Sequence, residues 1–297
     1  MRKFLSAFFS LLGVAVFFSC RSRNTLPTAK SGKSLLWEIT GNGLKKPSYF
    51  FGTMHLMCAE DAGLSENVKW IIKTAGCVYL EVDMDNASEL LAGILELRKN
   101  NGQFLSEVLS TEDYTKVKSF FDKYQPSMPF SVLEQQPPLM LTSGLYELLL
   151  PCDKKDGSEL RIIEEAYQAK KETKGLETVA FQSSIFDSIP YAAQASELVK
   201  TIDSLEKQRR ILEEMIAVYR EQDVEKLYSL SVNGESAVSG FMELLLFSRN
   251  RNWAGKFPSI AKDNSTLFAV GAGHLGGDKG VLNLLKKEGY AIRPIEN

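Results

Sequence analysis

The chain has 297 residues, of which 44% are hydrophobic and 24% are charged. This composition is typical of a globular protein with a hydrophobic core and excludes a disordered chain. The formal net charge of −2 gives no basic surface, so nucleic acid is not an expected partner.

The first twenty residues have the features of an export signal. Two basic residues precede an apolar run, residues 4–18, and Ser19-Cys20 ends it. The run is shorter than the roughly 20 residues that cross a bilayer as a helix, and a small residue before cysteine suits cleavage with lipid attachment. We therefore expect residues 1–19 to be a signal peptide and Cys20 to be lipidated. An uncleaved membrane helix and a plain signal peptide are the alternatives, because the usual leucine before the cysteine is missing.

The predicted cleavage sets the domain boundaries. Residues 20–33 are expected to form the lipidated N-terminus and a flexible tether, because they are rich in Ser, Thr, Lys and Arg. A single domain, residues 34–297, follows. Removal of the signal peptide makes the formal net charge −4. We expect an exported lipoprotein of the bacterial periplasm or cell envelope, whose membrane contact is its lipid anchor.

Three cysteines remain beyond the predicted anchor, Cys58, Cys77 and Cys152, and none has the CxxC spacing of a metal site. An odd number allows at most one disulfide within the chain, and an oxidising compartment favours one. Cys77 lies in an apolar, strand-like run, where free cysteine behaves as a small buried hydrophobic residue. We assign no catalytic role to any cysteine.

The beginning of the domain predicts three strands and one helix. Two apolar runs, residues 35–40 and 48–52, flank a glycine-rich turn, which predicts an antiparallel pair. A helix with Ser65 as its cap follows. An apolar strand, residues 77–83, comes next and carries Glu81 near its end.

The middle of the chain is mainly helical. Residues 86–146 have helical spacing interrupted by prolines, which predicts a helical insertion. Another helix, residues 159–170, leads to a short strand, residues 173–179, that carries Glu177. Residues 191–252 are again helical in their spacing.

The chain closes with a strand, a helix and a strand, the strands at residues 265–270 and 290–295. Strands thus come from both ends of the domain, with helices between them. We predict an α/β fold of mixed α+β character, in which a single domain has a central mixed β-sheet and a large helical insertion that covers its active edge.

The chain has only two histidines, and both occur in the pattern Gly-x-x-His-Leu after an apolar run. These histidines are His55 and His274. Glycine lets the backbone turn tightly or approach a ligand closely at the end of a strand, which leaves the histidine at the rim of the sheet. Imidazole there suits a metal or general acid–base catalysis. A lone histidine more often satisfies a local backbone partner, but the matching contexts favour one shared site.

Carboxylates usually complete a hydrolytic metal site or act as its base. Glu81 and Glu177 are the candidates, because each lies in or just after an apolar strand, where an acid requires a partner. Glu159 ranks below them, because a position at a helix start already explains an acidic residue. Arg249 and Asn250 would supply donors to a developing oxyanion, although a solvated arginine at a helix end is the commoner case.

Ordered landmarks across nearly the whole mature domain resemble one known family. They are Leu36-Trp37-Glu38-Ile39, Phe51-Gly52-Thr53-Met54-His55, Tyr79-Leu80-Glu81-Val82-Asp83, Gly175-Leu176-Glu177-Thr178, Gln182, Arg249-Asn250 and Val270-Gly271-Ala272-Gly273-His274-Leu275. This set resembles the TraB/GumN family, which includes the Tiki-type proteases. The resemblance implies a mixed α/β fold with the histidines and a glutamate clustered. For Tiki-like members it also implies metal-dependent peptide cleavage with manganese or cobalt.

Carried onto this sequence, the resemblance makes His55 and His274 the motif histidines and Glu81 the acid that follows the first of them. Glu177 and Arg249 match further family landmarks. Relatives in this group also include proteins that bind peptides, and more distant ones resemble erythromycin esterases or haem-binding lipoproteins. Fold-level resemblance does not choose among these activities.

Residues and resemblance together favour a divalent-metal-dependent hydrolase, a peptidase acting on a peptide or protein substrate. His55, His274 and Glu81 would hold Mn, Co or Zn, and Glu81, Glu177 and Arg249 would be the catalytic groups. Ligand type alone does not choose the metal. Two alternatives stay open: a non-catalytic lipoprotein that binds a peptide or haem in the same cleft, and a metal-free, esterase-like hydrolase that uses histidine and glutamate.

Overall fold

The computed structural model of the chain describes residues 26–88, 91, 93, 103–125, 129–234 and 239–297. The predicted signal peptide, Cys20 and the first part of the tether lie outside the described residues. So does part of the predicted helical insertion, residues 94–102. Within the described ranges, the helices are all too short or too polar to span a membrane.

Six strands form one mixed sheet in the order β6-β4-β7-β2-β1-β8. Their bounds are β1 (Leu36–Thr40), β2 (Ser48–Thr53), β4 (Cys77–Val82), β6 (Thr173–Glu177), β7 (Thr266–Gly271) and β8 (Ala291–Ile295). β6, β4, β7 and β2 run parallel, whereas β1 is antiparallel to both β2 and β8. The four parallel strands therefore bring their carboxyl ends to one edge of the sheet, which is where α/β proteins place their ligands.

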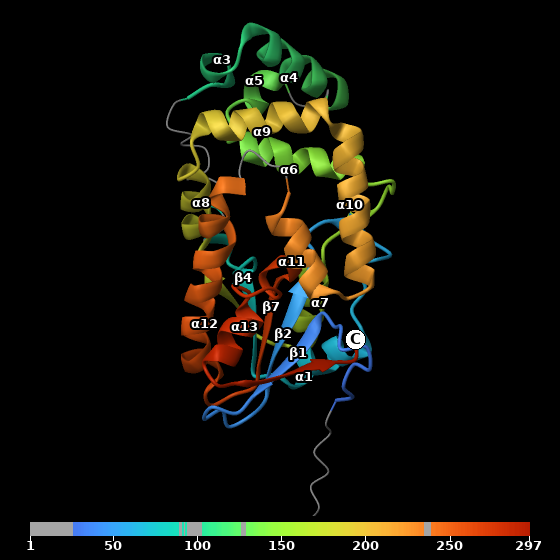
Figure 1. The fold of residues 1–297 in the computed structure, drawn as a ribbon, viewed down its shortest axis with the longest axis vertical. Helices are drawn as coiled ribbons and strands as arrows, with labels where there is room; N and C mark the ends of the chain where they lie inside the picture. The colour runs from blue at the N-terminus through green and yellow to red at the C-terminus, as the bar shows by residue number, and fades with distance from the viewer. Residues whose placement is uncertain (1–25, 89–90, 92, 94–102, 126–128, 235–238) are drawn as a thin grey trace, which may run out of the picture.

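A turn joins β1 to β2, and helices fill the longer connections between the other strands (Figure 1). The α-helices are α1 (Glu66–Thr74), α3 (Leu105–Val108), α4 (Thr111–Tyr124), α5 (Phe130–Leu133), α6 (Pro138–Leu149), α7 (Ser158–Gln168), α8 (Val179–Asp187), α9 (Tyr191–Asp203), α10 (Leu205–Arg220), α11 (Val224–Val232), α12 (Ser248–Ala261) and α13 (Val281–Lys287). Three short helices of other types are η2 (Ser239–Phe241), η3 (Glu243–Phe247) and η4 (Ala272–His274). Local sequence explains several starts. The side chains of Ser65, Ser110 and Thr178 each accept a hydrogen bond from the backbone N–H three residues later, as N-caps do.

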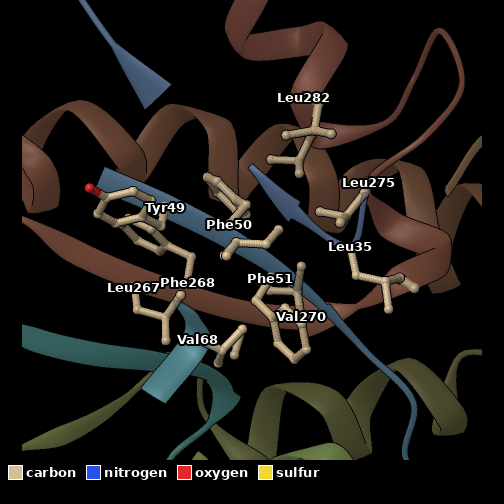
Figure 2. Packing of buried hydrophobic residues seen from close by; sticks show 14 of the residues in the cluster. Leu35, Tyr49, Phe50, Phe51, Val68, Leu267, Phe268, Val270, Leu275 and Leu282 are labelled. Atoms are coloured by element: carbon tan, nitrogen blue, oxygen red, sulfur yellow. The ribbon is translucent and has the colours of Figure 1, made fainter. Parts of the chain in front are cut away.

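The main core lies on the sheet and is built from aromatic and branched side chains of the central strands. Phe50 of β2 stacks on Phe268 of β7, with ring centroids 4.9 Å apart. Phe257 of α12 packs on the same two rings. Figure 2 shows these strand side chains together with Val68 of α1 and Leu282 of α13. Because β2 and β7 are buried along almost their whole length, their register and their carboxyl ends are held firmly.

A second hydrophobic cluster belongs to the helices α3, α4, α5, α6 and α9, which we call the helical tier. Its buried side chains include Phe121, Phe130, Leu145 and Leu198. In Figure 1 this tier lies at the end of the molecule away from the sheet, and α10 runs along one side between the two. The tier has its own core, so it does not depend on the sheet for burial of its apolar faces.

A short two-stranded sheet and a disulfide join the segment after His55 to the segment before α7. β3 (Met57–Cys58) pairs antiparallel with β5 (Lys155–Asp156). Beside this pair, Cys58 is bonded to Cys152, with their Cα atoms 5.8 Å apart. The one disulfide allowed by the cysteine count is therefore present. Cys77 carries no disulfide and is half-buried rather than fully buried.

The predicted fold class is confirmed, and each predicted strand is present within two residues of its expected ends. The predicted strand at residues 173–179 ends two residues early, because Thr178 caps α8. The pair β3–β5 was not predicted, because two-residue strands carry no periodic pattern. The domain boundaries at residues 19 and 33 remain predictions.

Candidate functional site

The predicted site residues come to one edge of the sheet from four strands and a helix. β2 and β7 pair in parallel with Thr53 opposite Gly271, so the two GxxH turns leave the sheet next to each other. β4 lies beside β7 and carries Glu81, and β6 lies beside β4 and ends at Glu177. Arg249, in the first turn of α12, reaches the carboxylates of both glutamates.

The glycine of the first motif, Gly52, is required by close packing. A methyl group on Gly52 would lie 2.9 Å from Leu275 Cδ1 and 3.0 Å from Ala272 Cβ. Any side chain at this position would push the two GxxH turns apart. The glycine therefore allows β2 to approach the turn that carries His274, as the spacing of the motif predicted.

His274 is buried and held by contacts on several sides. Its Nδ1 lies 2.6 Å from Asn250 Oδ1, and the Asn250 amide donates in turn to the carbonyl of Lys279 at 2.9 Å. Because the NH2 group of Asn250 donates to a carbonyl, its amide oxygen must be the atom that faces His274. An oxygen accepts, so His274 has the tautomer with hydrogen on Nδ1. The indole of Trp253 packs on the ring, with centroids 4.5 Å apart. The lone pair of His274 Nε2 is thereby left facing Glu81 and Arg249.

His55 is held by one side chain and is otherwise open. Its Nδ1 lies 2.7 Å from Glu159 Oε1, and its side chain is 68% exposed. The loop that carries it is tied to α7, because the N–H of Ser158 donates to the carbonyl of Met54 at 3.1 Å. Tyr219 of α10 adds a bond of 3.0 Å between its hydroxyl and Ser158 Oγ. The start of α7 thus positions both the loop and the carboxylate that orients its histidine.

A buried network joins the two predicted glutamates through Arg249. Its Nη2 donates to Glu81 Oε2 at 2.6 Å and its Nε to Glu177 Oε2 at 2.9 Å. Its Nη1 lies 3.4 Å from His274 Nε2. The amide of Gln182 donates to both carboxylates, at 3.3 and 3.4 Å. Buried charges are stable only when they are paired and hydrogen-bonded, and in this network nearly every donor and acceptor has a partner.

The electrostatics of the site keep its groups in distinct charge states. Burial opposes the charge on Glu81, but His274, Arg249 and His55 together hold the pKa of its carboxyl below the ordinary range. Burial lowers the pKa of His274 to about 3, so this imidazole is neutral at pH 7. The hydrogen bond to Glu159 raises the pKa of His55 to about 9. One histidine is thus a neutral lone-pair donor, and the other is protonated until something displaces its proton.

The two histidines and Glu81 meet over Gly271. A methyl group on Gly271 would lie 3.3 Å from Glu81 Oε1, 3.5 Å from His274 Cδ2 and 3.9 Å from His55 Nε2. The space that this methyl would fill is a cradle bordered by both imidazoles and a carboxylate. The N–H of Gly271 donates to Glu81 Oε1 at 2.8 Å and aims that oxygen toward the cradle.

A pocket of about 320 Å³ opens beside the cradle. It is lined by His55, Leu80, Glu81, Val82, Met84, Gly157, Glu159, Leu160 and Gln182. His55 and Glu81 line this pocket, while His274 lies behind them in the protein. A molecule in the pocket would therefore reach the exposed histidine and the buried carboxylate first.

The donor chemistry of the cradle fits a divalent cation, although its present spacing is wide. In each histidine Nδ1 is engaged by an oxygen, as in metal-bound histidines. Nε2 of His55 faces the cradle, whereas His274 turns its Cδ2 edge to the cradle and has its Nε2 between Arg249 and Glu81. Glu81 supplies an ionised oxygen, and Glu177 Oε1 is buried with no hydrogen-bond partner among the described residues. However, His274 Nε2 and Glu81 Oε1 are 3.8 Å apart. In the described part of the chain, groups of three or more His, Cys, Asp or Glu side chains spaced to hold an ion are absent.

All five residues singled out by the sequence, His55, His274, Glu81, Glu177 and Arg249, lie in this region, and their roles remain predictions. The sequence ranked Glu159 low, yet it holds His55. The sequence places Glu159 at the start of a helix, where the helix dipole alone favours an acidic residue, so its position did not mark it as a site residue.

Asn250 was expected as an oxyanion donor beside Arg249, and the structure gives it a different contact. Its side chain bonds to His274 and to the carbonyl of Lys279. Both groups of the amide are therefore engaged away from the pocket. Gln182 bridges the two glutamates, and only its place among the family landmarks had marked it.

Comparison with known proteins gives one family match. The family model described as the TraB/PrgY/gumN family matches residues 35–294. The chain is 22% identical to Metalloprotease TIKI1 of Danio rerio, over 87% of this chain and 62% of the relative. It is 22% identical to Metalloprotease TIKI2 of Danio rerio (89% and 61%) and to Metalloprotease TIKI1 of Homo sapiens (90% and 63%). The chain spans about three fifths of the length of these relatives. No solved structure matches it.

Proposed function

The chain belongs to the TraB/PrgY/gumN family, and from that premise we propose that it is a divalent-metal-dependent hydrolase that cleaves peptide bonds. One observation carries the proposal: His55 and His274 each have Nδ1 held by an oxygen, and both rings border the cradle over Gly271 beside the Glu81 carboxylate. Relatives named metalloproteases support the reaction class.

In this proposal His55, His274 and Glu81 hold the ion, which is Mn, Co or Zn. When bound, such an ion polarises a carbonyl and lowers the pKa of water. The other residues prepare these ligands. Asn250 keeps His274 in the tautomer that has its lone pair on Nε2, and Glu159 does the same for His55 once its proton is displaced.

Arg249, Glu177 and Gln182 support Glu81 from behind. The guanidinium pairs with both carboxylates and helps to keep that of Glu81 ionised, because its burial without a cation would favour protonation. Glu177 lies deeper than Glu81, with a side chain only 1% exposed. We assign it to orienting Arg249 and not to contact with substrate. Arg249, whose side chain is itself buried, is then a positioning residue rather than a donor to an oxyanion.

A second candidate, a metal-free hydrolase, is favoured by one observation. Arg249 is a cation already bonded to Glu81 and 3.4 Å from His274 Nε2, so a positive charge stands beside two of the three proposed ligands. In that case the exposed His55, held by Glu159, would be the acid–base group facing the pocket. The two candidates differ in whether a chelator stops the reaction.

Export is part of the proposal. Disulfides persist mainly in oxidising compartments, so the bond between Cys58 and Cys152 supports an extracytoplasmic location. We propose that residues 1–19 are the export signal and that Cys20 carries the lipid anchor. The substrate would then be a peptide or protein segment within reach of a membrane surface.

The proposal is tested by incubating the protein with a pool of short peptides and following the products by mass spectrometry. We expect cleavage with at least one of Mn²⁺, Co²⁺ and Zn²⁺, loss of cleavage in chelator and recovery on return of the ion. Glu81→Gln should abolish it. Glu38→Gln is the matched control, because Glu38 is a sheet glutamate paired with Arg293 away from the site.

Each negative result has a distinct meaning. Cleavage that continues unchanged in chelator contradicts the metal and favours the metal-free hydrolase. If no peptide is cleaved under any of these conditions, the hydrolase proposal fails.

A further inference from the structure

The pocket beside the cradle has one apolar wall that the proposed chemistry does not use. Leu80 and Val82 come from β4, Met84 follows that strand, and Leu160 projects from the first turn of α7. Met84 and Leu160 are large hydrophobic residues that remain 38% and 53% exposed. Exposed apolar side chains that meet at a pocket mark a surface that another molecule covers.

The charged residues of the pocket are already paired. Glu159 is bonded to His55, and Glu81 to Arg249. Among the described residues that line the pocket, none is a lysine or an arginine. A basic side chain of a ligand would have to compete with these existing partners, and an acidic one would meet two carboxylates. An uncharged apolar side chain would meet neither obstacle, because it needs only the apolar wall.

We propose that this pocket binds a large apolar side chain of the substrate, such as Leu, Met or Phe, next to the bond that is cleaved. The peptide nature of the occupant rests on the proposed function. The apolar character rests on the pocket itself.

The elements that form the wall explain how the pocket would direct cleavage. Leu160 is the residue after Glu159, and Met84 lies three residues after Glu81. The same turn and the same strand end therefore carry both the apolar contacts and the groups that flank the cradle. A side chain seated on this wall would place its own backbone beside His55 and Glu81. Methionine adapts to different apolar shapes, so Met84 suits a pocket that accepts several large side chains rather than one.

The test uses labelled peptides of Gly, Ser and Ala that differ only at one central residue, which is Leu, Phe, Asp or Lys. Binding to the protein is measured by fluorescence anisotropy in chelator, and cleavage is measured separately with Mn²⁺ or Co²⁺. We expect the Leu and Phe peptides to bind about ten- to a hundred-fold more tightly than the other two, as burial of such a side chain implies. Leu160→Glu and Met84→Glu should each remove the preference.

Val132→Glu is the matched control, because Val132 is an exposed apolar residue of α5 in the helical tier. It should leave the preference intact. Thermal unfolding of each variant checks that it is folded. Equal affinities for all four peptides, tightest binding of the Lys peptide, or a preference that survives both pocket variants would each overturn the inference.

The two readouts separate this inference from the proposed function. A preference for Leu and Phe in binding, with no cleavage, supports the apolar pocket and contradicts hydrolysis. Cleavage without any preference contradicts the pocket and leaves hydrolysis standing.

Discussion

The two GxxH turns leave neighbouring parallel strands, yet they hold their histidines in different ways. His274 is buried, packed on Trp253 and bonded to Asn250. His55 is exposed, and Glu159 is the one side chain bonded to it among the described residues. The first belongs to the sheet core. The second is carried by a loop that β3, β5 and a disulfide tie to α7.

This difference suggests a division of labour between a rigid ligand and an adjustable one. His274 has no freedom to move without breaking the core, so it sets the position of the site. His55 can turn with little loss of packing, so it can close on an ion or a substrate.

The largest expected effect is the loss of peptide cleavage in variants of either histidine. The same two variants should differ in folding stability. His55→Ala and His274→Ala should both abolish peptide cleavage, because each removes a proposed ligand. His274→Ala should destabilise the fold more, by about 1–3 kcal/mol, since it leaves Asn250 buried without its partner. His55→Ala should cost about 1 kcal/mol or less, because His55 is exposed and the pocket lets water reach the Glu159 carboxylate that it leaves behind. Urea unfolding and peptide cleavage measure the two effects, and equal destabilisation by both variants would contradict the comparison.

The buried cation should matter most for stability. Arg249→Met would leave Glu81 and Glu177 buried without their counter-ion, and we expect a loss of about 3–5 kcal/mol in the free energy of unfolding. Arg220→Met is the control, because Arg220 makes a two-pronged pair with Asp61 but is 58% exposed. That change should cost about 1 kcal/mol or less. Similar losses for both variants would show that the buried network behind Glu81 contributes no more to stability than an exposed ion pair does.

The disulfide should protect the His55 side of the site. Cys58 and Cys152 close a separation of 94 residues, and replacing both by Ser should lower the free energy of unfolding by about 2–5 kcal/mol. Hydrogen exchange should rise in β3 and in the His55 loop while β7 stays protected. Cys77→Ser, which breaks no disulfide, is the control. Equal exchange in both turns would mean that the disulfide does not act on this loop.

The smallest effects should come from the residues that orient the imidazoles. Glu159→Ala and Asn250→Ala should each weaken metal binding about ten- to a hundred-fold, as the loss of such hydrogen bonds does in other metal sites. Isothermal titration with Mn²⁺ or Co²⁺ measures this. Glu159→Gln should be milder than Glu159→Ala, because its carbonyl oxygen still accepts from Nδ1. Unchanged affinity in both Ala variants would contradict the roles assigned to these residues.

The sequence predicted the site residues that lie at the ends of strands. It did not predict the residues whose place in the site depends on tertiary contacts. Both histidines, Glu81 and Glu177 were found because each ends an apolar run, and parallel strands bring such ends together. The strand order was not predicted, since it depends on long crossovers through helices.

The hydrogen-bond partners of the two histidines were harder to predict from the sequence, for a physical reason. Glu159 and Asn250 are helical residues, and an acidic or amide residue of a helix is ordinarily solvated, whereas both are buried here. Glu159 lies 104 residues beyond His55, and their meeting depends on the pairing of β3 with β5 and on the Cys58–Cys152 bond. Neither leaves a periodic pattern in the sequence.

The most direct test of the shared metal site uses the fact that the chain has only two histidines. Protein labelled with ¹⁵N in histidine alone, and purified without a histidine tag, should show two imidazoles by NMR, with His274 carrying hydrogen on Nδ1. One equivalent of Zn²⁺ should shift Nε2 of both histidines together, and Glu81→Gln should weaken that response. Shifts of one imidazole alone, or of neither, would contradict the account that the two GxxH turns form one metal site.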